Sequence, residues 1–591
     1  KGALGNVILK KSDTFIKNKF FPDTKLNYAN NLLKKNTKEI AIIFKSENDY
    51  KTKLSWYDLN SNVAKVAGWM KSKGIKKGDR IAAYLPNIPE TVIAYLSSSV
   101  LGAVWSSCSP DFGTAGVIDR FSQINPKILF IADKYFYNGK KINVLTRLSK
   151  IIENVPSINK VVIVPYPGEE SKKKENLKIN QYNWKELINI KNTNKIKYVM
   201  SNFNDPLAIL YSSGTTGKPK CICHGIGGVL LQHNKELQIH CDVKENDRVF
   251  YFTTCGWMMW NWLVGSLSVG ATILLFDGSP TYKKEDLLFE FVSEEKATLF
   301  GVSAKYIDVI NNSNLIPKNN YNLSKLRTIC STGSPLSREG FKYIYKNIKK
   351  DVHLASISGG TDILSCFVLG NLFQAVSVGE IQNSGLGMDV DIFNEDGISV
   401  KNTKGELVCK KPFPSMPVKF WDDKGNKKYS SAYFKKYQNI WHHGDFAKKT
   451  DNGGFIIFGR SDTTLNPGGV RLGTSEIYSA VEKLKEVKES IVIGQSWKND
   501  VRIILFVVLN NGYTLREKLN FRIRNIIRSH ASPRHVPSKI IEISEIPKTK
   551  NGKLVELAVK QTIEGEKIKN LEALANPDCL RQFKNIKELN E

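Results

Sequence analysis

The chain has 591 residues, which is too long for a single hydrophobic core, so we expect two or more domains. Hydrophobic residues make up 41% and charged residues 24%, the composition of an ordinary soluble globular protein. The formal charge of +29 would suit a nucleic-acid-binding protein, but the lysines are scattered and no zinc-finger spacing or RNA-binding aromatic signature accompanies them. We therefore expect neither nucleic acid nor a membrane as a partner, whereas an anionic small substrate would benefit from the positive field.

Cysteine usage indicates a reducing compartment. The nine cysteines are dispersed and odd in number, which argues against a disulfide framework. The chain opens with Lys1 and lacks the charged-then-apolar pattern of a signal peptide, which favours a trimmed, cytoplasmic chain. Cys221, Cys223 and His224 invite a metal reading, but no second ligand pair follows at zinc spacing, so a buried strand is the better interpretation.

In chain order, apolar runs alternate with amphipathic stretches such as 89–101, which predicts a parallel α/β architecture. Strands are expected at 41–44, 80–85, 127–131, 160–164, 208–210 and 272–276. The nearly uncharged run 255–276 is long enough to span a bilayer, but Gly265 and Gly270 interrupt it. A core helix followed by a core strand is therefore expected there.

The strand at 208–210 leads into a loop, residues 211–220 (YSSGTTGKPK), that concentrates glycines, hydroxyl groups and lysines. Glycines let the backbone approach a ligand closely, and exposed N–H groups, hydroxyls and ammonium groups suit phosphate oxygens. The spacing differs from the common NTPase loop, which needs Gly, four residues and then Gly-Lys-Ser/Thr. We expect polyphosphate binding by Ser212, Ser213, Gly214, Thr215, Thr216, Gly217, Lys218 and Lys220.

Short strands and turns at 385–427 predict a small β-rich subdomain, and a separate α/β pattern begins near Arg460. Within that second pattern we expect helices at 476–487 and 514–529 and strands at 490–494 and 502–508. The predicted fold is α/β. A large multi-layer N-terminal domain (1–459) with parallel or mixed sheets and a small β subdomain precedes a smaller α+β C-terminal domain (460–591).

Further motifs follow the loop in a fixed order: SISGGTD at 356–362, WHHGD at 441–445, FGRSD at 458–462 and IPKTKNGK at 546–553. Together with the glycine-hydroxyl loop they resemble the adenylate-forming superfamily of acyl-CoA synthetases, luciferases and peptide-synthetase adenylation domains. The string at 21–30 is similar to the acetyl-CoA-synthetase branch. The resemblance covers almost the whole chain and implies ATP, Mg²⁺ and coenzyme A (CoA) as ligands, with a mobile C-terminal domain.

For the first half-reaction, the resemblance implies that Lys553 bridges the acid carboxylate and the α-phosphate, whose like charges need a cation between them. It assigns Thr361 to the α-phosphate and Asp362 to Mg²⁺, where the short side chain leaves a bridging water open. Asp445 would hold the ribose hydroxyls and Arg460 the ribose or phosphates. Gly333, Ser334 and Pro335 resemble an adenine-binding turn, and Gly359 and Gly360 complete the ATP site.

Plainer roles stay open at this point for each of these residues. The alternative for Lys553 is an ordinary solvated lysine in a basic chain. The alternative for the polar residues is a role in a helix cap or a turn. His442 and His443 are interpreted as structural, because adenylation needs no general base.

For the second half-reaction, the resemblance implies a hinge at Asp462 and a thiol-facing segment at 466–471. Gly468 and Gly469 would let the pantetheine arm pass close to the backbone, and Arg471 would meet a CoA phosphate. Lys140, with its neighbour Lys141, is a further candidate for the CoA nucleotide phosphates.

The acid is predicted from Gly359, where acetate-specific relatives place a bulky Trp, so that a longer acid fits. Trp257, Met258 and Met259 would line this acyl pocket, and Trp257 or Asn261 could donate to a keto oxygen. Gly359 could instead serve the backbone alone. The expected substrate is acetoacetate, with propionate, butyrate or acetate as alternatives and nucleic-acid binding as a remote one. The oligomeric state is not readable.

Overall fold

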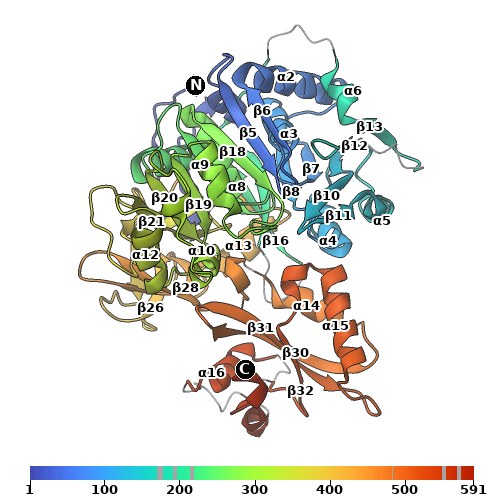
Figure 1. The fold of residues 1–591 in the computed structure, drawn as a ribbon, viewed down its shortest axis with the longest axis vertical. Helices are drawn as coiled ribbons and strands as arrows, with labels where there is room; N and C mark the ends of the chain where they lie inside the picture. The colour runs from blue at the N-terminus through green and yellow to red at the C-terminus, as the bar shows by residue number, and fades with distance from the viewer. Residues whose placement is uncertain are drawn as a thin grey trace. The chain divides into compact units, whose positions relative to one another are not determined.

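The computed structural model describes residues 1–169, 177–190, 196–212, 218–462, 464–470, 472–481, 483–548, 554–566, 568, 574 and 576–591. The chain forms two compact units (Figure 1). Unit 1 comprises Lys1–Pro110, Phe121–Tyr211 and Cys221–Phe458, and unit 2 comprises Asp111–Arg120, Ser212–Lys220 and Gly459–Glu591. The functional division predicted at residue 460 stays a prediction.

Two large sheets contain the strands that the apolar runs predicted. The eight-stranded sheet has the order β13-β12-β9-β7-β8-β15-β16-β27, in which β13 to β15 pair in parallel and β27 pairs antiparallel with β16. Its strands are β7 (Arg80–Tyr84), β8 (Val104–Cys108), β9 (Ile128–Ala132), β12 (Lys160–Val164), β13 (Asn180–Asn183), β15 (Pro206–Ser212), β16 (Lys220–Gly225) and β27 (Lys419–Phe420).

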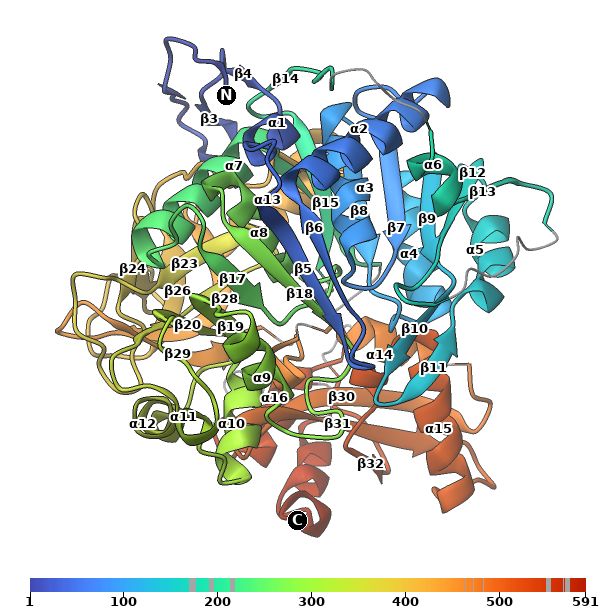
Figure 2. The same ribbon diagram turned by 45° about the horizontal axis from the view of Figure 1, so that its top comes forward.

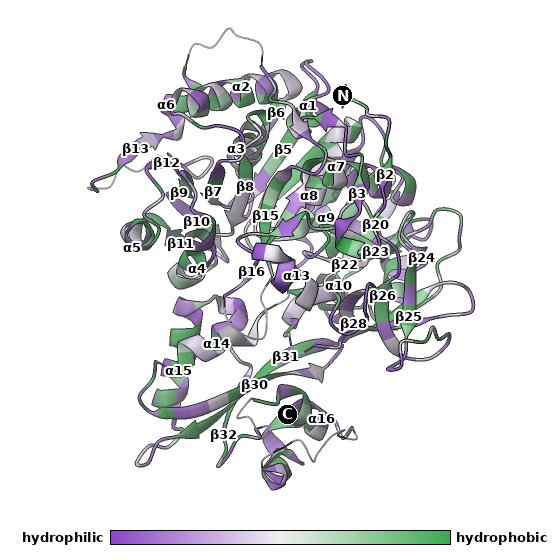
Figure 3. Ribbon diagram, turned by 180° about the vertical axis from the view of Figure 1, so that it is seen from behind, coloured by the Kyte–Doolittle hydropathy of each residue, from purple (hydrophilic) through white to green (hydrophobic). Residues whose placement is uncertain are grey.

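The seven-stranded sheet has the order β21-β20-β19-β17-β18-β5-β6 and is parallel except for the β5–β6 pair. Its strands are β5 (Ile40–Ser46), β6 (Lys51–Ser55), β17 (Arg248–Tyr251), β18 (Thr272–Asp277), β19 (Leu299–Ser303), β20 (Thr328–Thr332) and β21 (His353–Ser356). The strand predictions at 41–44, 80–85, 127–131, 160–164, 208–210 and 272–276 are all confirmed. Figure 3 shows much of β5 in hydrophobic colours, as expected for a parallel strand covered on both faces.

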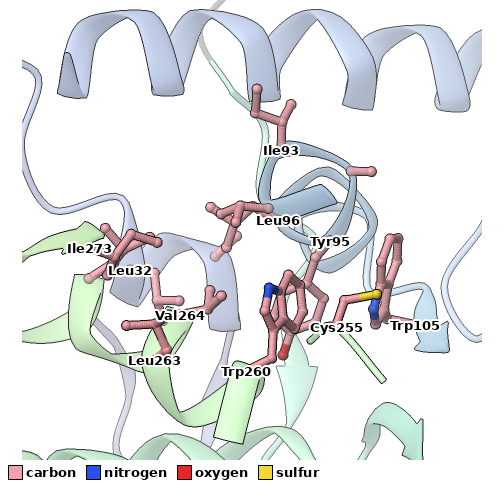
Figure 4. Packing of buried hydrophobic residues seen from close by; sticks show 14 of the residues in the cluster. Leu32, Ile93, Tyr95, Leu96, Trp105, Cys255, Trp260, Leu263, Val264 and Ile273 are labelled. Atoms are coloured by element: carbon pink, nitrogen blue, oxygen red, sulfur yellow. The ribbon is translucent and has the colours of Figure 1, made fainter. Parts of the chain in front are cut away.

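Two helices, α3 (Pro89–Val100) and α8 (Met258–Gly265), share one hydrophobic core with strands of both sheets (Figure 2). Figure 4 shows Tyr95 of α3 between Trp105 and Trp260, with ring centroids 5.6 and 5.4 Å away. The Trp260 indole N–H donates to Asn87 Oδ1 at 3.0 Å, which satisfies its polar atom inside the core.

Another set of helices forms a separate core against the seven-stranded sheet: α9 (Leu287–Glu294), α10 (Ala304–Asn312) and α12 (Arg338–Tyr343). The uncharged run at 255–276 folds as α8, the 3₁₀ turn η4 (Ser266–Val269) and β18, which confirms a helix followed by a strand. In the part of the chain that the structure describes, no helix combines the length and apolar character needed to cross a membrane.

The predicted β-rich segment supplies only half of a four-stranded sheet, in which the β25–β26 and β26–β28 pairs are antiparallel. Strands β25 (Val390–Phe393) and β26 (Gly405–Cys409) come from it, and β28 (Trp441–Lys449) and β29 (Phe455–Arg460) complete the sheet. Beside this sheet, β22 (Ser358–Gly360), β23 (Ser365–Leu369) and β24 (Asn383–Ser384) form a small sheet of their own. Phe367 and Trp441 lie in one hydrophobic cluster that joins the two sheets.

Unit 2 is built on a three-stranded sheet of β30 (Val487–Trp497), β31 (Asp500–Leu509) and β32 (Lys539–Glu542). One face packs against α14 (Thr474–Val481) and α15 (Glu517–His530), and the other packs against α16 (Glu556–Ile563). The helix predicted at 476–487 was too long. Backbone bonds from Leu484 N to Val481 O and from Val487 N to Leu484 O, both 3.0 Å, turn the chain directly into β30.

Candidate active site

Two of the predicted nucleotide motifs follow neighbouring parallel strands. β20 leads into Gly333, Ser334 and Pro335, and β21 leads into the segment 357–362. The Thr332 hydroxyl donates to the Ile357 carbonyl at 2.9 Å and ties the two strand ends together. Gly333 has a φ of +94°, a conformation that favours glycine. Because parallel strands end at one edge of a sheet, the predicted adenine and phosphate contacts share the edge where α/β proteins bind ligands.

Asp362 is buried and held in place at this edge. Its side chain is 1% exposed, and its Oδ1 accepts a hydrogen bond of 2.6 Å from the Tyr433 hydroxyl. Tyr433 ends α13 (Lys427–Tyr433), and its ring stacks on Trp441 with centroids 3.8 Å apart. Thr361, the preceding residue, is half-buried. Sequence reasoning missed Tyr433, because nothing in its lysine-rich surroundings distinguishes it.

Strand β28 brings His443 and Asp445 to the same place. His443 Nε2 lies 3.6 Å from Asp445 Oδ2 and 3.4 Å from the Gly359 carbonyl oxygen. A Cβ added to Gly360 would lie 3.3 Å from His443 and 3.6 Å from Asp362 Oδ2. The structure therefore unites Gly359, Gly360, Asp362 and Asp445, with His443 between them. His442 lies differently, since its Nε2 is 3.0 Å from Glu406 Oε2.

His224 approaches Asp362 from β16 as a neutral imidazole. Its side chain is fully buried, and burial lowers its pKa to about 3, an effect that the Asp362 charge partly offsets. Burial raises the pKa of the neighbouring Cys223 to about 12, so this thiol stays protonated. The interpretation of 221–224 as a buried strand is confirmed. No metal-binding cluster of His, Cys, Asp and Glu occurs among the described residues.

Gly359 has a backbone reason to be glycine. It pairs with Cys366 across the β22–β23 hairpin, and a Cβ at this position would lie 2.2 Å from the Ser365 carbonyl oxygen and 2.7 Å from Cys366 Cα. Any side chain there would force the two strands apart. This is the alternative that the sequence left open, and the role of Gly359 as an open pocket wall stays a prediction.

The other predicted acyl-pocket residues lie at the start of α8. Trp257 is the half-buried N-cap, and its ring packs edge-on against Tyr251 with centroids 6.2 Å apart. Met258, Met259 and Asn261 are buried within the helix. Their contact with an acid, and the donor to a keto oxygen, stay predictions.

In unit 2, Arg460 and Asp462 form an ion pair, and Asp462 Oδ1 also accepts from the backbone N of Thr464 at 3.1 Å. Gly468 and Gly469 have φ values of +57° and +79°, in a loop closed by the Leu465–Leu472 bridge. Gly468 N donates to Asp500 Oδ1 at 2.9 Å, which fixes the loop backbone. The hinge and CoA roles of this segment stay predictions.

The lysine pair of unit 1 lies at the exposed start of β11 (Lys140–Asn143), which forms a hairpin with β10 (Lys134–Tyr137). The Glu47 carboxylate fixes the hairpin tip by accepting from Asn138 N and Gly139 N, each at 2.9 Å. Lys140 begins β11, and Lys141 forms a 2.8 Å ion pair with Glu169. Lys140 is therefore presented on a fixed turn, which is compatible with a phosphate contact.

Several predicted residues lie in or beside gaps in the described chain. Ser212 is buried at the end of β15, Lys218 is exposed, and Lys220 begins β16. The remaining predicted site residues lie outside the described residues: Ser213, Gly214, Thr215, Thr216, Gly217, Arg471 and Lys553.

Comparison with known proteins places the chain in a family. A model of the AMP-binding enzyme family matches residues 31–416, and a model of the AMP-binding enzyme C-terminal domain matches residues 476–553. The acetoacetyl-coenzyme A synthetase of Rhizobium meliloti (strain 1021) is 49% identical over 588 residues, covering 100% of this chain and 90% of that protein. The chain belongs to the acetoacetyl-CoA synthetase family.

Other comparisons agree with this family. The acetoacetyl-CoA synthetase of Gallus gallus is 44% identical over 581 residues, covering 96% of this chain and 86% of that protein. A solved structure, acetoacetyl-CoA synthetase from Streptomyces lividans, matches with a TM-score of 0.75 and 37% identity, covering 99% of this chain and 90% of that one. The resemblance to adenylate-forming enzymes is thus confirmed, as is the predicted fold with a large α/β N-terminal part and a smaller C-terminal domain.

Proposed function

We propose that this protein ligates acetoacetate to CoA at the expense of ATP, giving acetoacetyl-CoA, AMP and pyrophosphate through an acetoacetyl-adenylate. The observation that carries the proposal is the meeting of Asp362, His443 and Asp445 beside Gly359 and Gly360, in a chain 49% identical to an acetoacetyl-CoA synthetase. The same family argument makes it an AMP-forming acid–thiol ligase.

In the first half-reaction, a carboxylate oxygen of the acid attacks the α-phosphorus of ATP, and pyrophosphate leaves. Both reactants are anions, so the site must supply positive charge where they meet. Lys553 is proposed to supply it, and Thr361 to contact the α-phosphate. The adenine turn at Gly333 and the Asp445 carboxylate, which accepts two hydrogen bonds, would hold the nucleoside.

Asp362 is proposed to help hold Mg²⁺, directly or through a water. Mg²⁺ usually keeps several waters and binds through one or two carboxylates plus substrate phosphates. This mode suits Asp362, because the Tyr433 hydroxyl orients its buried carboxylate. When bound, the ion would offset charge on the leaving pyrophosphate.

In the second half-reaction, the CoA sulfur attacks the acyl carbonyl carbon, a C–S bond forms, and AMP leaves with the electron pair of the C–O bond. The thiol proton passes to solvent. Gly468 and Gly469 are proposed to admit the pantetheine arm, with Arg471 and Lys140 at the CoA phosphates and Asp462 at the hinge. Left-handed backbone at both glycines supports a segment without side-chain bulk.

The decisive experiment measures pyrophosphate release acid by acid with CoA absent, followed by thioester formation with CoA. We expect acetoacetate to give the highest kcat/KM among acetoacetate, acetate, propionate and butyrate, with AMP as the nucleotide product. Preference for acetate would overturn the substrate, and release of ADP with orthophosphate would overturn the reaction class. Salt-sensitive duplex binding tighter than ATP binding would favour the remote nucleic-acid alternative.

A further inference from the structure

A buried glutamate links three elements around the candidate active site. Glu236 is 0% exposed and begins the π-helical turn η3 (Glu236–His240), which continues α7 (Ile226–Lys235). Its Oε1 accepts from the Ser365 hydroxyl at 2.5 Å and from Cys366 N at 3.0 Å. Its Oε2 accepts from the Trp262 indole N–H at 3.0 Å. One carboxylate thus joins η3 to β23 and to α8.

Two histidines of the same helical segment hold the ends of β23. His233 Nε2 donates to the Leu364 carbonyl at 2.9 Å, and His240 Nδ1 donates to the Gly370 carbonyl at 2.7 Å. Burial lowers the pKa of His233, so it can donate there as a neutral imidazole. Figure 2 shows α7 near α8 and β23, and contacts connect α7 with both. Hydrogen bonds therefore hold β23 at the residue before it, at its first two residues and at the residue after it.

The turn that these bonds fix contains Thr361 and Asp362. It leads from β22 to β23 and ends at Leu364, whose φ of +49° is sparsely populated for a residue with a side chain. Such a conformation persists when surrounding contacts determine it. Here the His233 bond to Leu364 and the Glu236 bonds to the next two residues do so. The backbone position of Asp362 therefore depends on a helical segment that is distant in the sequence.

The third bond of Glu236 reaches the helix predicted to line the acyl pocket. Trp262 lies on α8, whose first residues are Met258 and Met259. A Cβ added to Gly265 at the other end of α8 would lie 2.8 Å from His233 Nδ1, so α7 and α8 are closely packed there. Glu236 consequently sets the separation between α8 and the β22–β23 hairpin, the two predicted walls of the acyl pocket.

A carboxylate suits this position better than its neutral isostere. Three donors converge on it, and an ionised carboxylate only accepts hydrogen bonds. A glutamine has one acceptor oxygen. With that oxygen facing Ser365 and Cys366, its NH₂ group would face the Trp262 indole N–H, and two donors would then oppose each other. The nearby Lys235 ammonium lies 3.9 Å from Glu236 Oε1 and donates to the Leu386 carbonyl at 3.0 Å. Burying a charge is weak evidence for stability, because apolar replacements are often neutral or stabilising.

We propose that Glu236 is a positioning residue that fixes the Thr361–Asp362 turn against α8 and thereby sets both the adenylation rate and the discrimination among short acids. The inference rests on the proposed function, because it needs an acid-dependent adenylation to act on. Glu236 is not proposed to touch a reacting group. It acts through Ser365, Cys366 and Trp262.

The test is Glu236→Gln, assayed for pyrophosphate release with acetoacetate and butyrate and for thermal stability. We expect kcat to fall about tenfold, the loss that one broken buried hydrogen bond produces, with the KM for ATP nearly unchanged. The ratio of kcat/KM for acetoacetate over butyrate should fall as well. Adding Trp262→Phe removes the donor that opposes the amide, so the double variant should recover the ratio relative to Glu236→Gln.

Two further variants separate positioning from general stability. Glu295→Gln removes a buried carboxylate that pairs with Lys51 and Arg248 away from the hairpin, and it should lower the melting temperature while leaving the acid ratio unchanged. Ser365→Ala removes one of the three donors to Glu236 and provides a milder test in case Glu236→Gln does not fold. It should lower the acetoacetate-to-butyrate ratio of kcat/KM as well, but by a smaller factor.

An unchanged acid ratio in Glu236→Gln or, should that variant not fold, in Ser365→Ala would overturn the inference. An equal shift in Glu295→Gln would do the same. The proposed function fails separately, if the wild-type enzyme does not use acetoacetate. In that event, the ratio measured between the acids that it does use still decides the role of Glu236.

Discussion

At the scale of single residues, the phenol of Tyr433 decides how Asp362 is presented. The hydroxyl lies 2.6 Å from Oδ1, and the ring cannot swing away because it stacks on buried Trp441. A buried hydrogen bond to a charged group contributes about 1.5–3 kcal/mol, enough to favour one carboxylate orientation. The role of Asp362 in holding Mg²⁺ stays a prediction, and this fixed orientation is what it would act through.

We therefore expect Tyr433→Phe to keep the fold and to weaken adenylation. The stacking survives, but Asp362 loses a donor, so pyrophosphate release should slow about tenfold and half-maximal rate should need more Mg²⁺. Steady-state assays across a Mg²⁺ titration measure both effects. Tyr429→Phe is the matched control. It removes a buried hydroxyl of the same helix that has no hydrogen-bond partner among the described residues, and it should leave both quantities unchanged.

Motif order could predict Asp362, Gly360 and Asp445, because each stands in a short string whose neighbours carry the signal. It could not predict Tyr433 or Glu236. Tyr433 lies 71 residues from the carboxylate it orients, and Glu236 lies 129 residues from the Ser365 hydroxyl. Their roles arise from packing between elements and leave no local pattern. For Gly359, the sequence predicted an open wall of the acyl pocket. The structure shows a different need for glycine, because a side chain there would collide with the backbone of β23.

At the scale of elements, the β22–β23 hairpin depends on the absence of a side chain at Gly359. Gly359→Ala would place its methyl group 2.2 Å from the Ser365 carbonyl oxygen, so the strands must separate and the turn that contains Asp362 must shift. We expect pyrophosphate release to fall by a similar factor with acetate and with acetoacetate, together with a lower melting temperature. Selective loss of acetoacetate at unchanged stability would instead support the pocket-wall role.

At Gly468, by contrast with Gly359, we expect an added methyl group to leave the fold and the first half-reaction intact. A Cβ there meets nothing within 4 Å, so Gly468→Ala costs only about 1 kcal/mol for the left-handed backbone at φ +57°. Adenylation should be unaffected, while conversion of isolated acetoacetyl-adenylate plus CoA to thioester should slow, because a methyl group narrows the path proposed for pantetheine. Single-turnover assays of the two steps test this. A slower first step with an unchanged second step would contradict the assignment.

Sequence periodicity could predict the long elements but not the short ones that build the site. Runs such as 272–276 are apolar throughout, and parallel strands buried on both faces need that composition. Strands β22 and β24 are only three and two residues long, with no apolar pattern, and exist because β23 offers them partners. The π turn at 236–240 likewise has no local signature and is held by its bonds to β23 and α8.

At the scale of the whole molecule, buried neutral histidines make the folded state less stable as the pH falls. Burial lowers the pKa of His224, His233, His240 and His353, that of His224 to about 3. In the unfolded chain each histidine has a pKa of about 6.5, so below that pH the unfolded state binds more protons than the folded one. The stability that these histidines contribute is therefore present above about pH 6.5 and lost as the pH falls.

We expect the melting temperature to fall steadily from pH 6.5 to pH 5, before most carboxylates titrate. His224 alone removes about 1.4 kcal/mol for each pH unit below its unfolded pKa. His224→Asn lacks this contribution, so its melting temperature should depend less steeply on pH, whatever its absolute stability. Calorimetry of both proteins at several pH values provides the comparison. Parallel curves would show that His224 is protonated in the folded state.

The proposed separation of the two half-reactions leads to the last prediction. Unit 2 has its own sheet with a hydrophobic core on each face, as a body that reorients as a whole requires. If this body delivers Lys553 only for the first step, Lys553→Ala should abolish pyrophosphate release yet still convert supplied acetoacetyl-adenylate and CoA to thioester. Lys548→Ala is the matched control, because Lys548 pairs with Glu489 at 2.5 Å and should affect neither step. Equal loss of both steps in Lys553→Ala would contradict the proposal that the C-terminal domain takes a different orientation in each half-reaction. The Lys553 ammonium group would then be needed for thioester formation as well as for adenylation.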